Sequence, residues 1–326
     1  MFMEPIQING HTLRNRIVMP PMATGKAQNG ALGEDLVEYY QARARGTALI
    51  IVEHEYIMPQ GMAHSGQLSM ADDSVIPAYL KLTEAVHKEG AKIIAQLNHA
   101  GAKAKDSGFH PTGPSAVAFM DGEVPTELSK EQIKDVIYAF ATAAMRARKA
   151  GFDGVEIHSA HGYLLNQFYS PIMNHRTDEY SVVTMENRTR IQREAIRAVR
   201  DAVGKDFIVA VRLGACDFME GGSEIRDIPD AVHSLETEDV DFIDITAGMM
   251  GFLRPGHTEA GYLKDLSLSA KSVATVPILL TGGVTKPEEA EALLQEGAAD
   301  LIGVGRALLK DADWTIRALA GSNGKV

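Results

Sequence analysis

Eight short apolar runs, rich in β-branched residues, recur along the 326 residues and alternate with longer amphipathic segments. The runs lie at 17–19, 48–52, 92–97, 154–158, 208–213, 242–246, 278–281 and 301–304. Each is nearly continuous in hydrophobicity, which is typical of parallel strands buried on both faces. Eight strand-helix units predict the α/β class and a (β/α)8 TIM barrel, with residues 1–326 forming a single domain.

The segments between the runs carry helix signals, and one segment before them carries a turn signal. Helices are predicted at 77–89, 130–150, 187–203 and 287–296. Each is followed by a glycine, as expected at the residue after a helix. Residues 6–13, with Asn9-Gly10 at their centre, predict a short β-hairpin that caps the bottom of the barrel.

Composition narrows the classes of function. The net charge of −11 argues against nucleic acid or an anionic membrane as a partner. No apolar run approaches the roughly 20 residues that span a bilayer, and residues 1–8 lack a signal peptide's basic and apolar regions, so we expect a cytoplasmic protein. The single cysteine, Cys216, cannot form an intrachain disulfide, a Cys-ligated zinc site or a self-contained iron–sulfur cluster.

Polar residues and glycines follow the predicted strands, and in a barrel the strand ends form one mouth. Gly282-Gly283 and Gly305-Arg306 follow the last two strands, where exposed backbone N–H groups and a guanidinium favour a phosphate site. A phosphorylated substrate or FMN would satisfy that site, and tight turns without a ligand are the alternative. Gln96 and Arg212 suit the edge of a flavin ring, although Arg212 in a buried ion pair is equally compatible.

His158, His161 and Tyr163 follow the fourth predicted strand within six residues. Two imidazoles can donate hydrogen bonds to a developing oxyanion, and a phenol can protonate carbon. A metal site is the alternative, but Ser159, Ala160 and Gly162 supply no third ligand. Ordinary loop packing is the other alternative. The sequence therefore favours a site that polarises a carbonyl, with no metal.

Four blocks in order resemble the Old Yellow Enzyme family of FMN-dependent ene-reductases, in particular its single-domain bacterial branch. The blocks are NRIVMPPM at 15–22, QLNHAG at 96–101, HSAHGYLLNQFYSP at 158–171 with NHRTDEY at 174–180 and ENR at 186–188, and the terminal Gly305-Arg306. The resemblance runs from Pro5 to about Leu309.

The resemblance implies a site and a reaction. The implied FMN contacts are Pro20, Pro21, Met22 and Ala23 along the ring, Gln96 and Arg212 at its pyrimidine edge, and Gly282, Gly283, Gly305 and Arg306 at the phosphate. His158 and His161 would hold the carbonyl oxygen of an enone or enal, and Tyr163 would protonate its α-carbon. The implied cycle is ping-pong, with NADH or NADPH as the transient electron donor. The sequence leaves open the nicotinamide preference and the oligomeric state, with a homo-oligomer as one option.

Several residues depart from the family pattern. Ala23 stands where relatives often carry Cys or Thr near the flavin, and His54 stands where many carry a small residue. His54 is predicted either to contact the cofactor or to face solvent from a loop. Residues 180–183 (YSVV) also differ from the familiar Tyr-Gly-Gly-Ser, so that loop is expected to be stiffer or differently placed.

Two other functions compete with the ene-reductase. A flavin-free TIM-barrel lyase or isomerase could use the same phosphate site, but it usually needs a Schiff-base lysine or metal-binding acid, and no predicted strand end carries such a lysine. A non-catalytic flavin protein has no use for His158, His161 and Tyr163. With one cysteine and an end at Val326, we also expect no cluster or second flavin region like those of the longer dienoyl-CoA and 2-enoate reductases.

Overall fold

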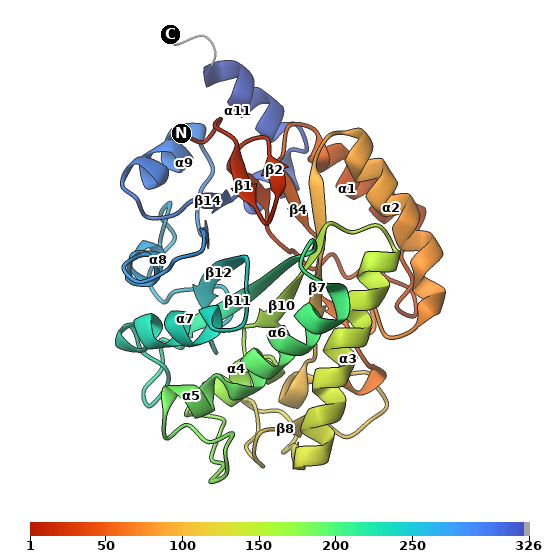
Figure 1. Cartoon of the computed structure of the whole chain (residues 1–326), viewed down its shortest axis with the longest axis vertical. Helices are drawn as coiled ribbons and strands as arrows, with labels where there is room; N and C mark the ends of the chain where they lie inside the picture. The colour runs from red at the N-terminus through yellow and green to blue at the C-terminus, as the bar shows by residue number, and fades with distance from the viewer. Residues whose placement is uncertain (323–326) are drawn as a thin grey trace.

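The computed structural model describes residues 1–322 and confirms the predicted barrel (Figure 1). Its parallel strands are β3 (Ile17–Met19), β4 (Leu49–Ile51), β7 (Lys92–Asn98), β10 (Gly154–Ser159), β11 (Ile208–Cys216), β12 (Phe242–Ala247), β13 (Ile278–Thr281) and β14 (Leu301–Gly303). Each pairs with the next in that order, and β14 pairs with β3, so the sheet closes on itself. All eight match the predicted runs to within three residues at either end.

Helices follow the strands and surround the barrel (Figure 1). They are α1 (Glu34–Ala44), α2 (Ile76–Lys88), α3 (Lys130–Lys149), α6 (Arg190–Val203), α7 (Ile228–Glu236), α8 (Lys264–Lys271), α9 (Pro287–Gln295), α10 (Arg306–Lys310) and α11 (Trp314–Ser322). The longest, α3, begins at a capping box in which Ser129 and Gln132 satisfy each other's backbone N–H groups. It buries an apolar stripe that includes Val136 and Phe140. None of the helices over residues 1–322 is both long and apolar enough to span a bilayer.

The helix predicted at 187–203 is interrupted. Residues Met185–Arg188 form a separate short helix, α5, and Thr189 lies between it and α6 with ψ near 1°. The Thr189 hydroxyl donates to the Met185 carbonyl and also contacts the Ser234 hydroxyl at 2.7 Å. This tertiary contact holds Thr189 off the helical path.

The N-terminal hairpin also matches its prediction. Strands β1 (Ile6–Ile8) and β2 (His11–Leu13) pair antiparallel across Asn9 and Gly10, whose φ angles are 45° and 75°. Ile8 and Leu13 are buried against the first residues of the barrel strands, including Leu49 and Ile208. The hairpin therefore closes the end of the barrel opposite the strands' carboxyl ends.

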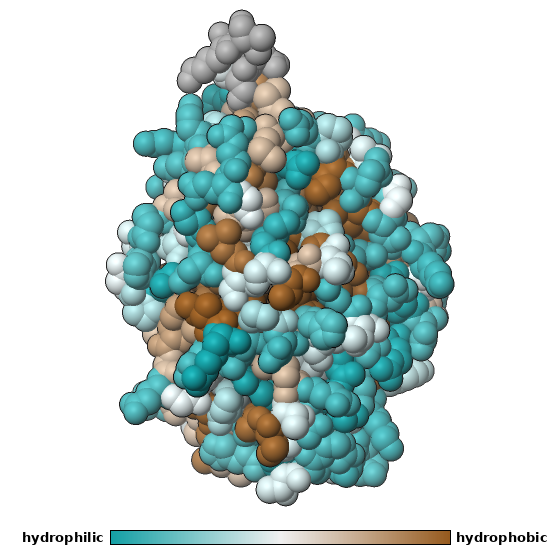
Figure 2. Space-filling model, turned by 60° about the vertical axis from the view of Figure 1, so that its left-hand side comes forward, coloured by the Kyte–Doolittle hydropathy of each residue, from teal (hydrophilic) through white to brown (hydrophobic). Residues whose placement is uncertain are grey.

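The segment after β4 forms two short strands that extend one side of the barrel at the carboxyl ends of its strands. Strand β5 (Glu55–Tyr56) pairs with Leu97 and Asn98 at the end of β7, and β6 (Leu68–Ser69) pairs with β5. This segment places His54 and Gln67 beside the ends of the barrel strands. On the outer surface, the face in Figure 2 is mostly hydrophilic, with separate apolar spots.

We expect Leu13→Ala to lower the free energy of unfolding by about 2–5 kcal/mol, because it opens a cavity in the packed barrel bottom. Thr12→Ala, at the exposed neighbouring position, should change it by no more than about 0.5 kcal/mol. Denaturant unfolding of both variants checks this. Equal stability of the two variants would show that the hairpin does not seal the core.

Candidate active site

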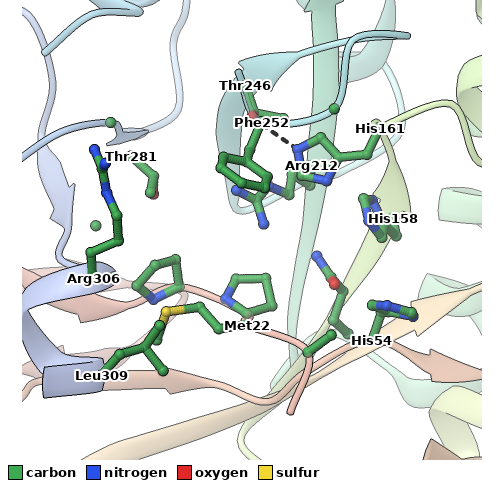
Figure 3. A pocket seen from close by; sticks show the side chains of 18 of the residues that line it. Met22, His54, His158, His161, Arg212, Thr246, Phe252, Thr281, Arg306 and Leu309 are labelled. Carbon is green, nitrogen blue, oxygen red and sulfur yellow. Dashed lines mark hydrogen bonds between the residues drawn. The ribbon is translucent and has the colours of Figure 1, made fainter. Parts of the chain in front are cut away.

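A cavity of about 510 Å³ opens at the carboxyl ends of the barrel strands (Figure 3). Every site residue predicted from the sequence lines it: Pro20, Pro21, Met22, Ala23, His54, Gln96, His158, His161, Tyr163, Arg212, Gly282, Gly283, Gly305 and Arg306. Other lining residues, which include Lys103, Thr246, Phe252, Tyr262, Thr281 and Leu309, complete the wall. The expectation that residues at the carboxyl ends of the barrel strands share one site is therefore confirmed by this common cavity.

The glycines of the last two strands occupy one side of the cavity. Gly283 has φ of 73°, and a Cβ there would collide with the Glu259 carbonyl, so the turn itself requires glycine. A Cβ on Gly305 would lie 3.2 Å from the Met22 sulfur, on the cavity wall. Gly283 therefore fits the tight-turn alternative, whereas Gly305 lines the cavity at a position where even a Cβ would press against Met22.

Two polar groups on this side have no protein partner. The Thr281 hydroxyl is buried and makes no hydrogen bond. Arg306 points into the cavity from the exposed rim, and no carboxylate within residues 1–322 pairs with it (Figure 3). A buried hydroxyl and a free guanidinium at the same wall are groups that a phosphate would satisfy.

Gln96 and Arg212 lie at the floor of the cavity. The Gln96 side-chain amide donates to Glu156 at 2.6 Å, so its carbonyl oxygen is left for another partner. The Arg212 Nε lies 3.0 Å from Asp244, so the buried ion pair left open by the sequence does form, while the same guanidinium lines the cavity. The two interpretations of Arg212 are compatible.

The carboxyl groups beneath the floor are unusual in being buried. Glu156 and Asp244 are both inaccessible to solvent. Burial raises the pKa of both, and the Arg212 charge opposes the rise. At neutral pH these two carboxyl groups therefore carry less negative charge than two freely ionised carboxylates would.

His158 and His161 lie on the side opposite Arg306 (Figure 3), and Tyr163 lies beside His158. The two imidazole rings are 5.1 Å apart, and the His158 ring is 5.1 Å from the Tyr163 ring. His161 has φ of 59°, in a turn held by Asn166, which accepts from the Gly162 N–H at 2.8 Å. The His161 Nε2 lies 3.1 Å from the Thr246 hydroxyl, and the His158 Nδ1 is buried without a partner.

Burial sets the protonation of this cluster. It holds the pKa of His158 and of His161 well below 6.5, with nearby positive groups adding to the effect. It also raises the pKa of Tyr163 to about 12. At neutral pH the imidazoles are therefore neutral and the phenol is protonated.

The sequence did not identify Lys103, which reaches the cavity from the turn Gly101–Lys103. Its ammonium donates to the His161 carbonyl at 2.8 Å and lies 4.6 Å from the centre of the Tyr163 ring. Burial lowers the pKa of Lys103 to about 8. A lysine six residues past the end of the third predicted strand, at 97, thus enters the site, although no strand end carries one.

His54 is buried, with 8% of its surface exposed, so the prediction of a solvent-facing loop histidine is wrong. Its Nδ1 lies 2.6 Å from the Gln67 amide nitrogen, and its Nε2 lies 3.5 Å from the Tyr163 hydroxyl. The residue belongs to the cavity wall.

The geometry defines a barrel with one cavity at the carboxyl ends of its strands, where a wall that fits a phosphate faces a cluster of two histidines and a tyrosine. The profile of the NADH:flavin oxidoreductase / NADH oxidase family matches residues 1–324, so the chain belongs to that family of flavin-dependent oxidoreductases.

Individual relatives support this assignment. An NADPH dehydrogenase of Bacillus subtilis is 39% identical, over 94% of this chain and 90% of its own. An NADH oxidase of Thermoanaerobacter brockii is also 39% identical and matches 98% of this chain, which spans about half (51%) of that protein. The solved old yellow enzyme homologue of Zymomonas mobilis superposes with a TM-score of 0.86 at 30% identity, over 98% of this chain and 93% of its own.

FMN and a nicotinamide donor are the cofactors of this family, as the sequence predicted. The residues present fit FMN. The unpartnered Thr281 hydroxyl and the free Arg306 guanidinium lie on one wall with Gly305, and the Gln96 carbonyl and the Arg212 guanidinium lie on the floor.

Arg306→Ala should raise the Kd for FMN by about tenfold or more, because a charge-assisted hydrogen bond to phosphate is lost. Binding of riboflavin, which lacks the phosphate, should hardly change. Flavin fluorescence titration measures both. Lys310→Ala, an exposed cation on the same short helix, is the control, and an equal loss in that variant would point to general electrostatic attraction.

Proposed function

We propose that this chain is an ene-reductase that uses FMN and NADH or NADPH to reduce the activated C=C bond of small α,β-unsaturated carbonyl compounds. The observation that carries the proposal is the cluster of two neutral imidazoles and a protonated phenol, facing the cavity opposite the phosphate-type wall. The proposed partner is an enone or enal.

The histidines would act on the carbonyl oxygen. A neutral imidazole N–H can donate a hydrogen bond, and the bond strengthens as the oxygen gains negative charge during reduction. His158 is buried and His161 is half-buried, so water has limited access to the oxygen. His161 is held by Thr246 and by its turn, which keeps the donors in place before the substrate enters.

Tyr163 would complete the reaction by protonating the α-carbon. Its O–H bond breaks, the electron pair stays on the phenol oxygen, and a C–H bond forms. Although a phenol with a raised pKa is a weak acid, the α-carbon of an enolate is a strong enough base to accept the proton.

When bound, FMN supplies the two-electron chemistry that connects the nicotinamide to the alkene. The residues proposed to hold it are those implied by the family resemblance: Pro20, Pro21, Met22, Ala23, His54, Gln96, Arg212, Gly282, Gly283, Gly305 and Arg306. What supports these roles is that all of them line one cavity.

Tyr163→Phe should slow reoxidation of the reduced enzyme by cyclohexenone by about 10²-fold or more, the usual contribution of a positioned general acid. Reduction by the nicotinamide does not need this proton and should proceed. Anaerobic stopped-flow absorbance follows both half-reactions.

Tyr169→Phe is the control, because Tyr169 is a buried tyrosine outside the cavity lining and its hydroxyl has no partner. Reoxidation of Tyr163→Phe at the wild-type rate would refute the assigned proton donor. A protein that stays colourless after incubation with FMN would refute the whole proposal.

His158 and His161 should contribute no step to the pH profile of enone reduction around pH 6.5, the ordinary pKa of histidine. Lowered pKa values mean that His158 and His161 lose their protons well below 6.5, so neither changes charge near that pH. Tyr163 keeps its proton until pH approaches 12. A step near pH 6.5 that disappears when the histidines are replaced would show that a histidine of ordinary pKa controls the reaction, whereas a step that remains belongs to another group such as Asp244.

A further inference from the structure

Beside Tyr163 lies a chain of polar contacts that the reaction above does not use. The Ala63 N–H donates to the Gln67 Oε1 at 2.6 Å, and the Gln67 Nε2 lies 2.6 Å from the His54 Nδ1. The His54 Nε2 in turn lies 3.5 Å from the Tyr163 hydroxyl. Gln67 is 1% exposed and His54 is 8% exposed, so protein groups rather than water determine these contacts.

The orientation of the Gln67 amide is fixed from two directions. Its oxygen must face the Ala63 N–H, since an amide nitrogen there would oppose a second donor. Its nitrogen also lies 3.3 Å from the His54 carbonyl, which can only accept. The Gln67 nitrogen is therefore the donor toward the His54 Nδ1.

This orientation selects one tautomer of His54. Because Nδ1 accepts from Gln67, a neutral His54 carries its proton on Nε2. Burial lowers the pKa of His54 to about 3, and the neighbouring His64, Lys103 and Arg212 add to the effect, so the ring stays neutral. The Nε2–H then faces the oxygen of Tyr163, whose ring centre is 5.2 Å away.

We propose that His54 is a positioning residue for Tyr163: its Gln67-fixed Nε2–H donates to the phenol oxygen. The phenol's own proton then has no acceptor in His54 and is directed at the substrate. After the proton has gone to carbon, the same N–H stabilises the phenolate, which water later reprotonates. The catalytic part of this inference rests on the proposed function.

The contact is long, as hydrogen bonds of a site without its ligands often are. A donor to the phenol oxygen stabilises the ionised form more than the neutral form, so the contact shortens as charge develops. His158 and Lys103 also flank the Tyr163 ring, but Lys103 lies over its face and donates to the His161 carbonyl. Of these three neighbours, His54 is the one within hydrogen-bond distance of the hydroxyl.

The first test is the tautomer itself. In ¹⁵N-histidine-labelled protein at neutral pH, long-range ¹H–¹⁵N correlation should show His54 as the Nε2–H tautomer. Loss of the signal in His54→Gln assigns it, or in His54→Ala if the first variant does not fold. A wild-type His54 in the Nδ1–H form, or as imidazolium, overturns the inference. This readout needs neither flavin turnover nor an enone.

The second test removes the Gln67 donor to the His54 Nδ1 by a substitution of nearly equal size. In Gln67→Glu a carboxylate still accepts from Ala63 but can no longer donate to His54, so His54 should switch to the Nδ1–H form or become charged. In the Nδ1–H form Nε2 can no longer donate, so the enone half-reaction should slow by about tenfold relative to the nicotinamide half-reaction. An imidazolium keeps its Nε2–H and should not slow it. An unchanged tautomer in this variant contradicts the proposed role of Gln67.

The third test separates the N–H from the packing of the ring. His54→Leu should slow the enone half-reaction by about tenfold, the loss expected for one hydrogen bond to a developing charge. His54→Gln, whose amide nitrogen can reach the place of Nε2, should recover most of that loss. Equal rates in both variants overturn the positioning role. If the wild-type enzyme reduces no enone, the proposed function fails, while the tautomer test still decides the Gln67–His54 contact.

Discussion

The closure of the parallel sheet between β7 and β10 is the constraint on which the site depends. Four pairs, from Gly154 with Ile94 to Ile157 with Leu97, join the third and fourth barrel strands, and the remaining strands complete the ring. This register sets Glu156 beside Gln96, and the next pairings set His158 and Asp244 beside Arg212. A shift of one residue would turn these side chains to the opposite face.

A buried polar layer of Glu156, Arg212 and Asp244 beneath the cavity fixes the side chains at its floor. Burying Glu156, Arg212 and Asp244 is unfavourable compared with apolar packing, and an ion pair only partly offsets that. In return the layer orients two groups: Glu156 binds the Gln96 amide and leaves its carbonyl free, and Asp244 anchors Arg212 at Nε. Raised carboxyl pKa values reduce the charge that must be buried.

Local patterns predicted much of this structure, and long-range contacts account for what they missed. Continuous apolar runs located all eight strands, and the rule that barrel sites lie at strand ends brought the predicted site residues to one cavity. Lys103 was missed because it is placed by the His161 carbonyl, 58 residues away. The break at Thr189 depends on Ser234, and no periodicity reports such a contact. The loop 180–183, which departs from the family pattern, does not line the cavity, so it can affect the site only indirectly.

The distribution of charge around the cavity links the two halves of the site. The chain carries a net charge of −11, yet Arg212, Lys103 and Arg306 all line this one cavity, and Glu156 and Asp244 lie beneath it with raised pKa values. The histidines add no charge, because they are buried and neutral. A positive cavity in a negative protein favours an anionic phosphate at one wall and a developing oxyanion at the other. Neutral donors would attract the uncharged carbonyl of the bound substrate only weakly. Their hydrogen bonds would therefore stabilise chiefly the transition state, in which negative charge develops on the carbonyl oxygen.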